Sequence, residues 1–154
     1  MAETIRCGVI GYGRLFNWGK WHGIKIQAVE GFELSAIFSR SQERRDAASA
    51  DFPSVEIYDD IPTMLERAEM DLAVIVTPHY THAPIAIECF RARKHAIVDK
   101  AMCRTVAEAD DMIEEANKAD RSLAVFHNRR RDGNVRAIKR AIDDGLIGDV
   151  YHVE

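Results

Sequence analysis

Five short apolar runs recur along this chain of 154 residues and constrain its fold more than any other feature. Their apolar residues follow one another rather than alternating strictly with polar ones, as is typical of strands that are buried on both faces of a parallel sheet. The runs are Ile5–Ile10, Leu34–Phe38, Leu72–Val76, Ala96–Val98 and Leu123–Phe126. A further, weaker strand is expected at Val55–Tyr58.

Stretches typical of helices separate these runs, at Lys20–Glu30, Gln42–Ala50, Ile61–Glu69, Ala83–Arg93 and Val106–Lys118. Thr105 and Glu108 form a capping box, which is a start signal for the last of these helices. Thr81 is expected to cap the helix that begins near Ala83. Strands that alternate with helices predict right-handed βαβ units. The expected fold class is therefore α/β, with a doubly wound, mostly parallel sheet of the Rossmann type.

The segment "GYGRLFNWGKWH", residues 11–22, follows the first predicted strand. Gly11 and Gly13 are placed for a tight turn that brings backbone N–H groups close to a pyrophosphate at the start of a helix. Phe16 takes the usual place of the third glycine, so we interpret the loop as lengthened, with Gly19 packing closely against the strand. A plain strand-to-helix turn is the alternative. The cofactor-binding residues predicted in this loop are Gly11, Gly13, Arg14 and Leu15.

The end of the second predicted strand bears on the type of cofactor. A carboxylate there would bind the ribose 2′-hydroxyl of NAD, but this chain has Ser39, Arg40 and Ser41 instead. A guanidinium flanked by hydroxyls suits the 2′-phosphate of NADP, because arginine grips phosphate oxygens with two N–H groups. We therefore expect NADP in preference to NAD, with a solvated loop arginine as the alternative. The missing carboxylate also argues against a methyltransferase that binds an adenosyl cofactor.

Charge and cysteine content exclude several classes of partner. The 21 basic and 25 acidic residues give a formal charge of −4, so neither nucleic acid nor a membrane surface is an expected partner. The three cysteines are far apart and odd in number, which indicates a reducing compartment.

No signal-type or membrane-spanning apolar segment is present, and a soluble, cytoplasmic protein is expected. His79 and His82 lack an evident third ligand, so no metal site is predicted.

The last part of the chain differs from the rest. An amphipathic helix is expected at about Asn134–Asp144, with Gly145 as its stop and a strand at Val150–Val153 that has no obvious neighbour. We therefore predict two parts: residues 1–127 as a nucleotide-binding domain, and residues 128–154 as a connecting helix and the first strand of a truncated second domain.

The stretch "DLAVIVTPHYTHAPIAIECFRARKHAIVDKA", residues 71–101, resembles the Gfo/Idh/MocA oxidoreductases, the family of glucose–fructose oxidoreductase and inositol dehydrogenase. The family pattern has an acid before the fourth strand, then Thr-Pro, a histidine, a Gly-Lys-His-Val step and Glu-Lys-Pro. The matching residues here are Asp71, Thr77, Pro78, His82, Arg93, Lys94, His95, Ala96, Asp99, Lys100 and Ala101. "GKWH" at residues 19–22 also resembles the Gly-x-x-His that opens the family's first helix, and "HNRRRDGNVRAIKRAIDDGLIG" resembles the segment that enters its substrate domain.

This resemblance implies that Thr77, Pro78 and His82 lie beside the nicotinamide. It also makes Lys100 the candidate catalytic residue. Asp99 and Lys100 are both expected to bind the cofactor. A lysine at the end of a parallel strand stands where such sheets bind ligands, and hydride transfer to or from an alcohol needs a group that moves the hydroxyl proton. Ala101 stands where the family has proline, and Asp99 where it has glutamate.

The expected function is that of the nucleotide-binding domain of an NAD(P)-dependent dehydrogenase acting on a sugar, cyclitol or polyol. Because the family's second α+β domain is lacking, we expect the chain alone to be inactive and the full-length protein to be a homo-oligomer. Two alternatives stay open: a non-catalytic nucleotide-binding module that senses redox state, and a nucleotide-dependent relative that resembles glycosidases.

Overall fold

Six parallel strands form one sheet in the computed structural model, which describes residues 4–13 and 17–152. The strand order is β3-β2-β1-β4-β5-β6, and every neighbouring pair is parallel. The strands are β1 Ile5–Ile10, β2 Phe32–Phe38, β3 Glu56–Tyr58, β4 Leu72–Ile75, β5 His95–Val98 and β6 Leu123–Val125. This order confirms the predicted doubly wound fold, since the chain winds outward in one direction from β1 and then in the other from β4.

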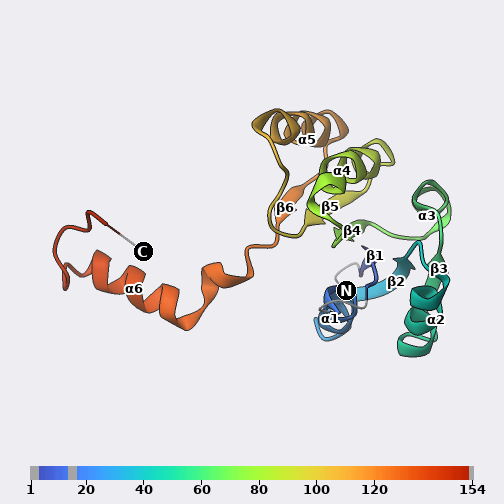
Figure 1. Ribbon diagram of the computed structural model, residues 1–154, viewed down its shortest axis with the longest axis horizontal. Helices are drawn as coiled ribbons and strands as arrows, with labels where there is room; N and C mark the ends of the chain where they lie inside the picture. Colours follow the sequence, from blue (N-terminus) through green and yellow to red (C-terminus); the bar gives the residue numbers. More distant parts are fainter. Residues whose placement is uncertain (1–3, 14–16, 153–154) are drawn as a thin grey trace.

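Helices follow the strands and lie on both faces of the sheet (Figure 1). They are α1 Trp18–Gln27, α2 Gln42–Asp51, α3 Ile61–Arg67, α4 His82–Arg91, α5 Val106–Ala119 and α6 Gly133–Asp143, with short 3₁₀ turns η1 His79–Thr81 and η2 Asn128–Arg131. None of the helices in the described residues is long and apolar enough to cross a membrane.

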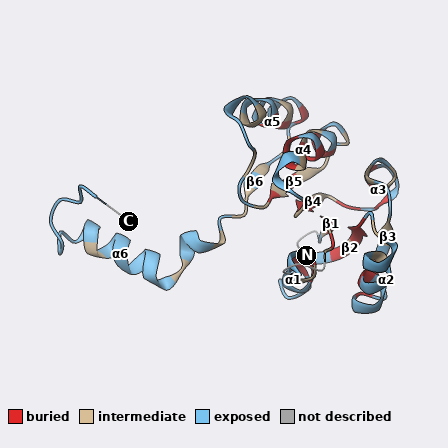
Figure 2. Cartoon of the chain, viewed as in Figure 1, coloured by how far each residue is buried: buried red, intermediate tan, exposed pale blue. Residues whose placement is uncertain are grey.

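The apolar runs are continuous because the sheet has a core on each face. Alternate side chains of β1 point to opposite faces, so Cys7 and Val9 join one buried cluster and Ile10 joins the other. Ile26 of α1 packs in the first cluster and Phe90 of α4 in the second. Figure 2 shows the buried residues concentrated along the central strands and the inner sides of these helices.

Of the two predicted helix caps, the one by Thr105 is confirmed, although the Glu108 carboxylate accepts the Arg104 N–H at 2.8 Å and not the Thr105 N–H of a full capping box. The Thr105 hydroxyl accepts a hydrogen bond from the Glu108 N–H at 3.1 Å, and the backbone of Thr105 is extended. The prediction that Thr81 caps α4 is wrong. Thr81 already has helical dihedral angles because η1 runs directly into α4, and its hydroxyl donates to the carbonyl of Pro78 or the hydroxyl of Thr77 instead.

The end of the chain extends away from the sheet (Figure 1). No residue of α6 is buried, and Figure 2 shows this helix almost wholly exposed. The predicted strand at residues 150–153 is wrong for 150–152, which have no regular structure, and residue 153 lies outside the described residues. A strand needs a neighbouring strand to accept its backbone hydrogen bonds, and no strand of the described chain lies beside this segment.

Candidate functional site

The predicted site residues come together at the carboxyl edge of the sheet. Loops that leave neighbouring parallel strands at the same edge carry Gly11 and Gly13 after β1, Ser39–Ser41 after β2, Thr77 and Pro78 after β4, and Asp99 and Lys100 after β5. The winding direction reverses between β1 and β4, and open α/β sheets bind ligands in the crevice at that point. Arg14 and Leu15 lie outside the described residues.

Gly11 makes the turn after β1 possible. Its φ of +113° is one that other residues rarely adopt, and a Cβ there would lie 2.9 Å from the Val76 carbonyl oxygen. Its N–H donates to the Phe38 carbonyl at 3.1 Å, so the turn is tied to the end of β2. The turn after β1 therefore contacts the ends of β2 and β4, and the lack of a side chain at Gly11 makes this close approach possible.

Gly19 was expected to pack against the first strand, and in the structure it packs against the turn that directly follows β1. It is buried in the first turn of α1, and a Cβ on it would lie 2.3 Å from the Gly11 carbonyl oxygen and 3.0 Å from Tyr12 Cα. Only glycine permits this approach, which brings the start of α1 against the glycine turn.

The residues after β2 divide into two roles. Ser39 is buried, and its hydroxyl donates to the Tyr12 carbonyl at 3.0 Å, so it holds the glycine loop in place. Arg45 supports the same corner by donating to the carbonyls of Ser39 and Arg40 at 2.9 and 2.8 Å. The side chain of Arg40 is exposed and Ser41 is half-buried, so these two are the ones open to a ligand.

Two pockets flank these loops. The first, of about 350 Å³, lies between the loops after β2 and β4, and its lining combines apolar side chains with the cation of Arg40 and the carboxylates of Asp59, Asp60 and Glu88. Its lining includes Phe38, Ile61, Pro62, Thr77, Pro84 and Ile85. The second, of about 290 Å³, is lined by Tyr12, Gly13, Lys20, Arg44 and Asp51 among others.

Arg44 lines the second pocket, and the sequence reasoning did not single it out. It is exposed in the first turn of α2, and its Nη1 lies 3.7 Å from the position that a Cβ on Gly13 would occupy. A cation is unfavourable at a helix amino terminus because that end carries partial positive charge. The position of Arg44 near a helix start was therefore a signal in the sequence for a bound anion, which would offset the repulsion between the guanidinium and the helix terminus.

An ion-pair network fixes the wall of the second pocket. The carboxylate of Asp51 accepts hydrogen bonds from the Tyr12 hydroxyl and from Lys20 Nζ, the latter at 2.5 Å. The hydrogen bond from Lys20, followed by that from Tyr12, holds the pKa of Asp51 below its ordinary value. Burial and the hydrogen bond to Asp51 raise the pKa of Tyr12. These contacts join the glycine loop to the end of α2.

Lys100 is exposed at the end of β5 and lines a pocket of about 400 Å³ together with His127, Asn128, Arg129, Arg130 and Val135. The Asp99 carboxylate accepts the Lys100 N–H at 2.8 Å, which fixes the backbone at this point. The Lys100–Ala101 peptide is cis. The lysine side chain is therefore free to meet a substrate at the same edge of the sheet as the glycine turn.

His79 and His82 contact the backbone around Lys100. His79 Nε2 lies 3.0 Å from the Lys100 carbonyl oxygen, and His82 Nδ1 lies 2.9 Å from the Ala101 carbonyl oxygen. His82 Nε2 lies 2.8 Å from the Thr77 carbonyl oxygen. No group of three potential metal ligands occurs in the part of the chain that the structure describes. The two histidines of the H-x-x-H sequence therefore contact the backbone of the loops after β4 and β5.

His82, which the family resemblance implies to lie beside the nicotinamide, is buried between two loops. Its side chain is fully buried, and both ring nitrogens face carbonyl oxygens. A neutral imidazole donates to one of these carbonyls, whereas an imidazolium donates to both. In this arrangement His82 contacts the backbone of the loops after β4 and β5.

His22 is a second residue that the sequence reasoning did not assign. It is buried in α1, packs edge-on against Phe126 at 4.7 Å between ring centroids, and its Nε2 has no hydrogen-bond partner in the described structure. Burial lowers the pKa of His22, the charge of Asp99 opposes this, and Lys25 adds to it. The sequence analysis matched His22 to the histidine of the family's Gly-x-x-His but gave it no role, because its burial is not visible in the sequence.

Together the sheet order, the glycine turn and the crevice define a nucleotide-binding Rossmann domain. A family profile described as "Oxidoreductase family, NAD-binding Rossmann fold" matches residues 5–127. The chain belongs to this family, the Gfo/Idh/MocA oxidoreductases, as the resemblance of residues 71–101 predicted.

Three relatives illustrate the similarity. The chain is 35% identical over 154 residues to the uncharacterized oxidoreductase YdgJ of Escherichia coli, covering 100% of this chain and 43% of that protein. It is 27% identical over 149 residues to the scyllo-inositol 2-dehydrogenase (NADP(+)) IolW of Bacillus subtilis, covering 97% and 40%. The crystal structure of the WlbA dehydrogenase from Bordetella pertussis, in complex with NADH and UDP-GlcNAcA, is 29% identical, with a TM-score of 0.88 and coverage of 97% and 45%. The chain thus spans about two fifths of the curated relatives.

Proposed function

We propose that this chain is the nucleotide-binding part of an NADP-dependent dehydrogenase that acts on a hydroxyl of a sugar, cyclitol or other polyol. The observation that carries the proposal is the position of Lys100, whose side chain opens at the same sheet edge as the glycine turn. The relatives named for inositol oxidation support a cyclitol or polyol as substrate.

The residues present fit a dinucleotide. The turn at Gly11 is a cradle that a Cβ would fill, and the start of α1 packs directly against it. In our proposal the backbone of Gly11, Gly13, Arg14 and Leu15 holds the pyrophosphate. The adenine lies in the pocket between the loops after β2 and β4, and Thr77, Pro78, Asp99 and Lys100 border the nicotinamide.

Two arginines favour NADP over NAD. None of the three residues directly after β2 is a carboxylate, and the exposed side chains of Arg40 and Arg44 line the two pockets beside the corner where we place the ribose 2′-position. Charge-assisted hydrogen bonds from guanidinium groups to phosphate are among the stronger ones in proteins. NAD is the second candidate.

The bound cofactor would accept or supply the hydride. Lys100 would move the proton of the substrate hydroxyl, because a lysine ammonium or amine within hydrogen-bond reach serves as general acid or base. We further propose that residues 1–127 form the nucleotide domain and residues 128–154 the connection to a second domain. Turnover, and association into a homo-oligomer, would then need the longer protein.

A titration tests the cofactor proposal. Fluorescence titration of the chain with NADPH and NADH should show tighter binding of NADPH, and Arg40→Ala should weaken NADPH binding about tenfold or more while leaving NADH binding nearly unchanged. Arg44→Ala should act in the same direction, and Arg140→Ala on the exposed face of α6 serves as the matched control. Equal affinity for the two nucleotides, unchanged in Arg40→Ala, would overturn the preference for NADP.

A further inference from the structure

We propose that His79 and His82 form a histidine clamp, a pair of positioning residues that sets where Lys100 stands over the cofactor crevice. The inference rests on the proposed role of Lys100 in proton transfer. It assigns the two histidines to the lysine loop and not to a ligand or a metal.

The histidine clamp contacts the chain just beyond the last hydrogen bond of the sheet. The last ladder contact of this strand region is the hydrogen bond from the Asp99 N–H to the Ile75 carbonyl at 2.9 Å. Beyond it, no backbone N–H of the described residues donates to the carbonyls of Lys100 or Ala101. His79 and His82 face these two successive carbonyls at 3.0 and 2.9 Å. Side chains from the β4–α4 connection therefore contact the two successive carbonyls that follow the Lys100 Cα, where sheet bonds are missing.

Spacing and burial make this contact specific. His79 is in η1 and His82 is the first residue of α4, so the two rings lie on neighbouring turns, 5.6 Å apart between centroids. The second nitrogen of His82 is 2.8 Å from the Thr77 carbonyl, at the end of β4. Since His82 is fully buried, it links the ends of β4 and β5 from beneath the crevice. A shift of either loop would change the position of Lys100 relative to the nicotinamide region.

The alternative is that these histidines only stabilise the fold, and His95 provides the comparison. His95 begins β5, the strand that leads to Lys100, and its Nδ1 accepts the Ser122 N–H at 2.9 Å. It therefore makes one histidine-to-backbone contact at the opposite end of the same strand. Loss of this contact should lower stability without moving the lysine.

Isosteric variants separate the two bonds of His82. The amide nitrogen of asparagine occupies the place of Nδ1, whereas that of glutamine occupies the place of Nε2. His82→Asn should therefore keep the bond to Ala101, and His82→Gln should keep only the bond to Thr77. A positioning role predicts that asparagine rescues and glutamine does not, and a role in stability alone predicts no such order.

The experiment follows Lys100 directly in the chain carrying ¹³C-dimethylated lysines, with the Lys100→Arg variant used to assign its signal. Adding saturating NADPH should shift the Lys100 signal in wild type and His82→Asn, but not in His82→Ala or His82→Gln. His79→Ala should reduce the shift, and His95→Ala should keep it despite a lower Tm. NADPH affinity should change by less than about threefold in all of them, because one hydrogen bond to a loop is at stake and the pyrophosphate cradle is intact.

The outcomes distinguish the two proposals. If wild type does not bind NADPH, the proposed function is wrong, and the clamp is then decided by the carbonyl ¹³C shifts of Lys100 and Ala101, which report hydrogen bonding at their oxygens. Movement of the Ala101 signal in His82→Gln but not in His82→Asn supports the clamp. Unchanged signals in both, or a Lys100 response to NADPH that survives in His82→Ala, would overturn it.

Discussion

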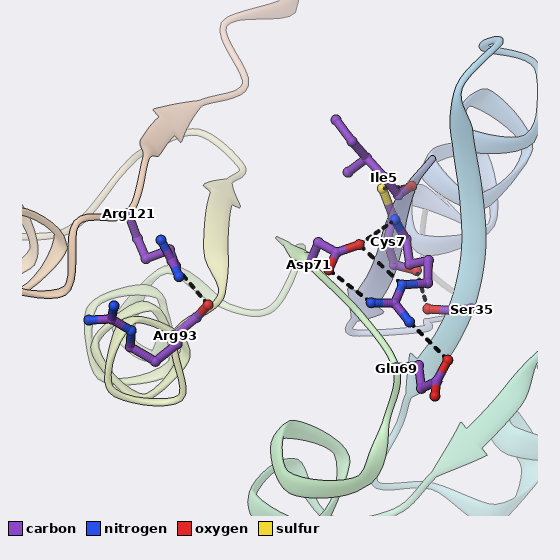
Figure 3. Close-up of polar contacts among 8 residues, drawn as sticks. Ile5, Cys7, Ser35, Glu69, Asp71, Arg93 and Arg121 are labelled. Carbon is purple, nitrogen blue, oxygen red and sulfur yellow. Dashed lines mark hydrogen bonds and ion pairs between the residues drawn. The ribbon is translucent and has the colours of Figure 1, made fainter. Parts of the chain in front are cut away.

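Arg6 of β1 and Asp71, the residue before β4, form a two-point ion pair at the amino-terminal edge of the sheet (Figure 3). Arg6 Nε and Nη2 donate to the two carboxylate oxygens of Asp71 at 3.2 and 3.1 Å, and the Arg6 N–H donates to the same group at 2.9 Å. The acid that the family resemblance placed before the fourth strand therefore joins the two central strands, at the edge opposite the nucleotide site.

Replacing Asp71 with asparagine should destabilise the fold in a pH-dependent manner. The hydrogen bond from Arg6 lowers the pKa of Asp71 from 3.8, so its contribution is present at neutral pH and is lost as the pH falls from 3.8 toward the lower folded value. Both side chains are about 40% exposed, so the cost at pH 7 is about 1 kcal/mol. Urea unfolding at pH 7 and pH 3 measures it.

Glu69→Gln is the matched control for this prediction. Glu69 also pairs with Arg6, at 2.8 Å, but its side chain is 85% exposed, so its loss should change the unfolding free energy little. Equal stability of Asp71→Asn and wild type at pH 7 would contradict the assignment.

Gly19→Ala should disrupt both the fold and the nucleotide site. The added Cβ would lie 2.3 Å from a backbone carbonyl oxygen, which cannot move aside as a flexible side chain could. Overpacking of this kind costs about 1–3 kcal/mol, and the displaced helix start should also weaken NADPH binding. Thermal unfolding and NADPH titration are the measurements.

Gly133→Ala is the control for this glycine. A Cβ at Gly133 meets nothing within 4 Å and its φ is not positive, so alanine should be neutral or slightly stabilising at the start of α6. If Gly19→Ala unfolds like Gly133→Ala and binds NADPH like wild type, the close approach of α1 to the turn is refuted.

His22→Leu should remove part of the acid sensitivity of the fold. The pKa of His22 is lowered in the folded state from 6.5, chiefly by burial, so the unfolded chain binds the proton more readily and stability falls as the pH drops below about 6.5. Leucine lacks the unpartnered Nε2 and should be at least as stable as histidine at pH 7. The difference in Tm between variant and wild type should grow between pH 7 and pH 5, and a constant difference would contradict the shift.

The sequence predicted the parts of this molecule that depend on local pattern. The run at Ile5–Ile10 was found because burial on both faces leaves a continuous apolar signal, and the cap at Thr105 because its partner Glu108 is three residues away. The family assignment followed from the order of short motifs in residues 71–101. The groups that form the cap are close in sequence, and the strand is indicated by its apolar composition alone.

The failures involve partners that are distant in sequence. The contact of His82 with the Ala101 carbonyl was not foreseen, because no local pattern shows which way a histidine at a helix start will turn. The expected contact of His82 with the nicotinamide stays a prediction. Thr81 was mistaken for a cap because η1 could not be foreseen from the residues between β4 and α4. Arg44 was overlooked because its proximity to Gly13 arises only when β1 and β2 pair.

The two threonines at helix starts give a direct test of that distinction. Thr105→Ala removes the hydroxyl that accepts the Glu108 N–H and should cost about 1 kcal/mol of unfolding free energy, whereas Thr105→Ser should retain most of it. Thr81→Ala should leave the capping of α4 unchanged, because the Thr81 hydroxyl bonds within η1. Hydrogen exchange at the first-turn amides measures this: protection should fall at Glu108 in Thr105→Ala and persist in α4 of Thr81→Ala. Lost protection in α4 would show that Thr81 caps the helix in solution after all.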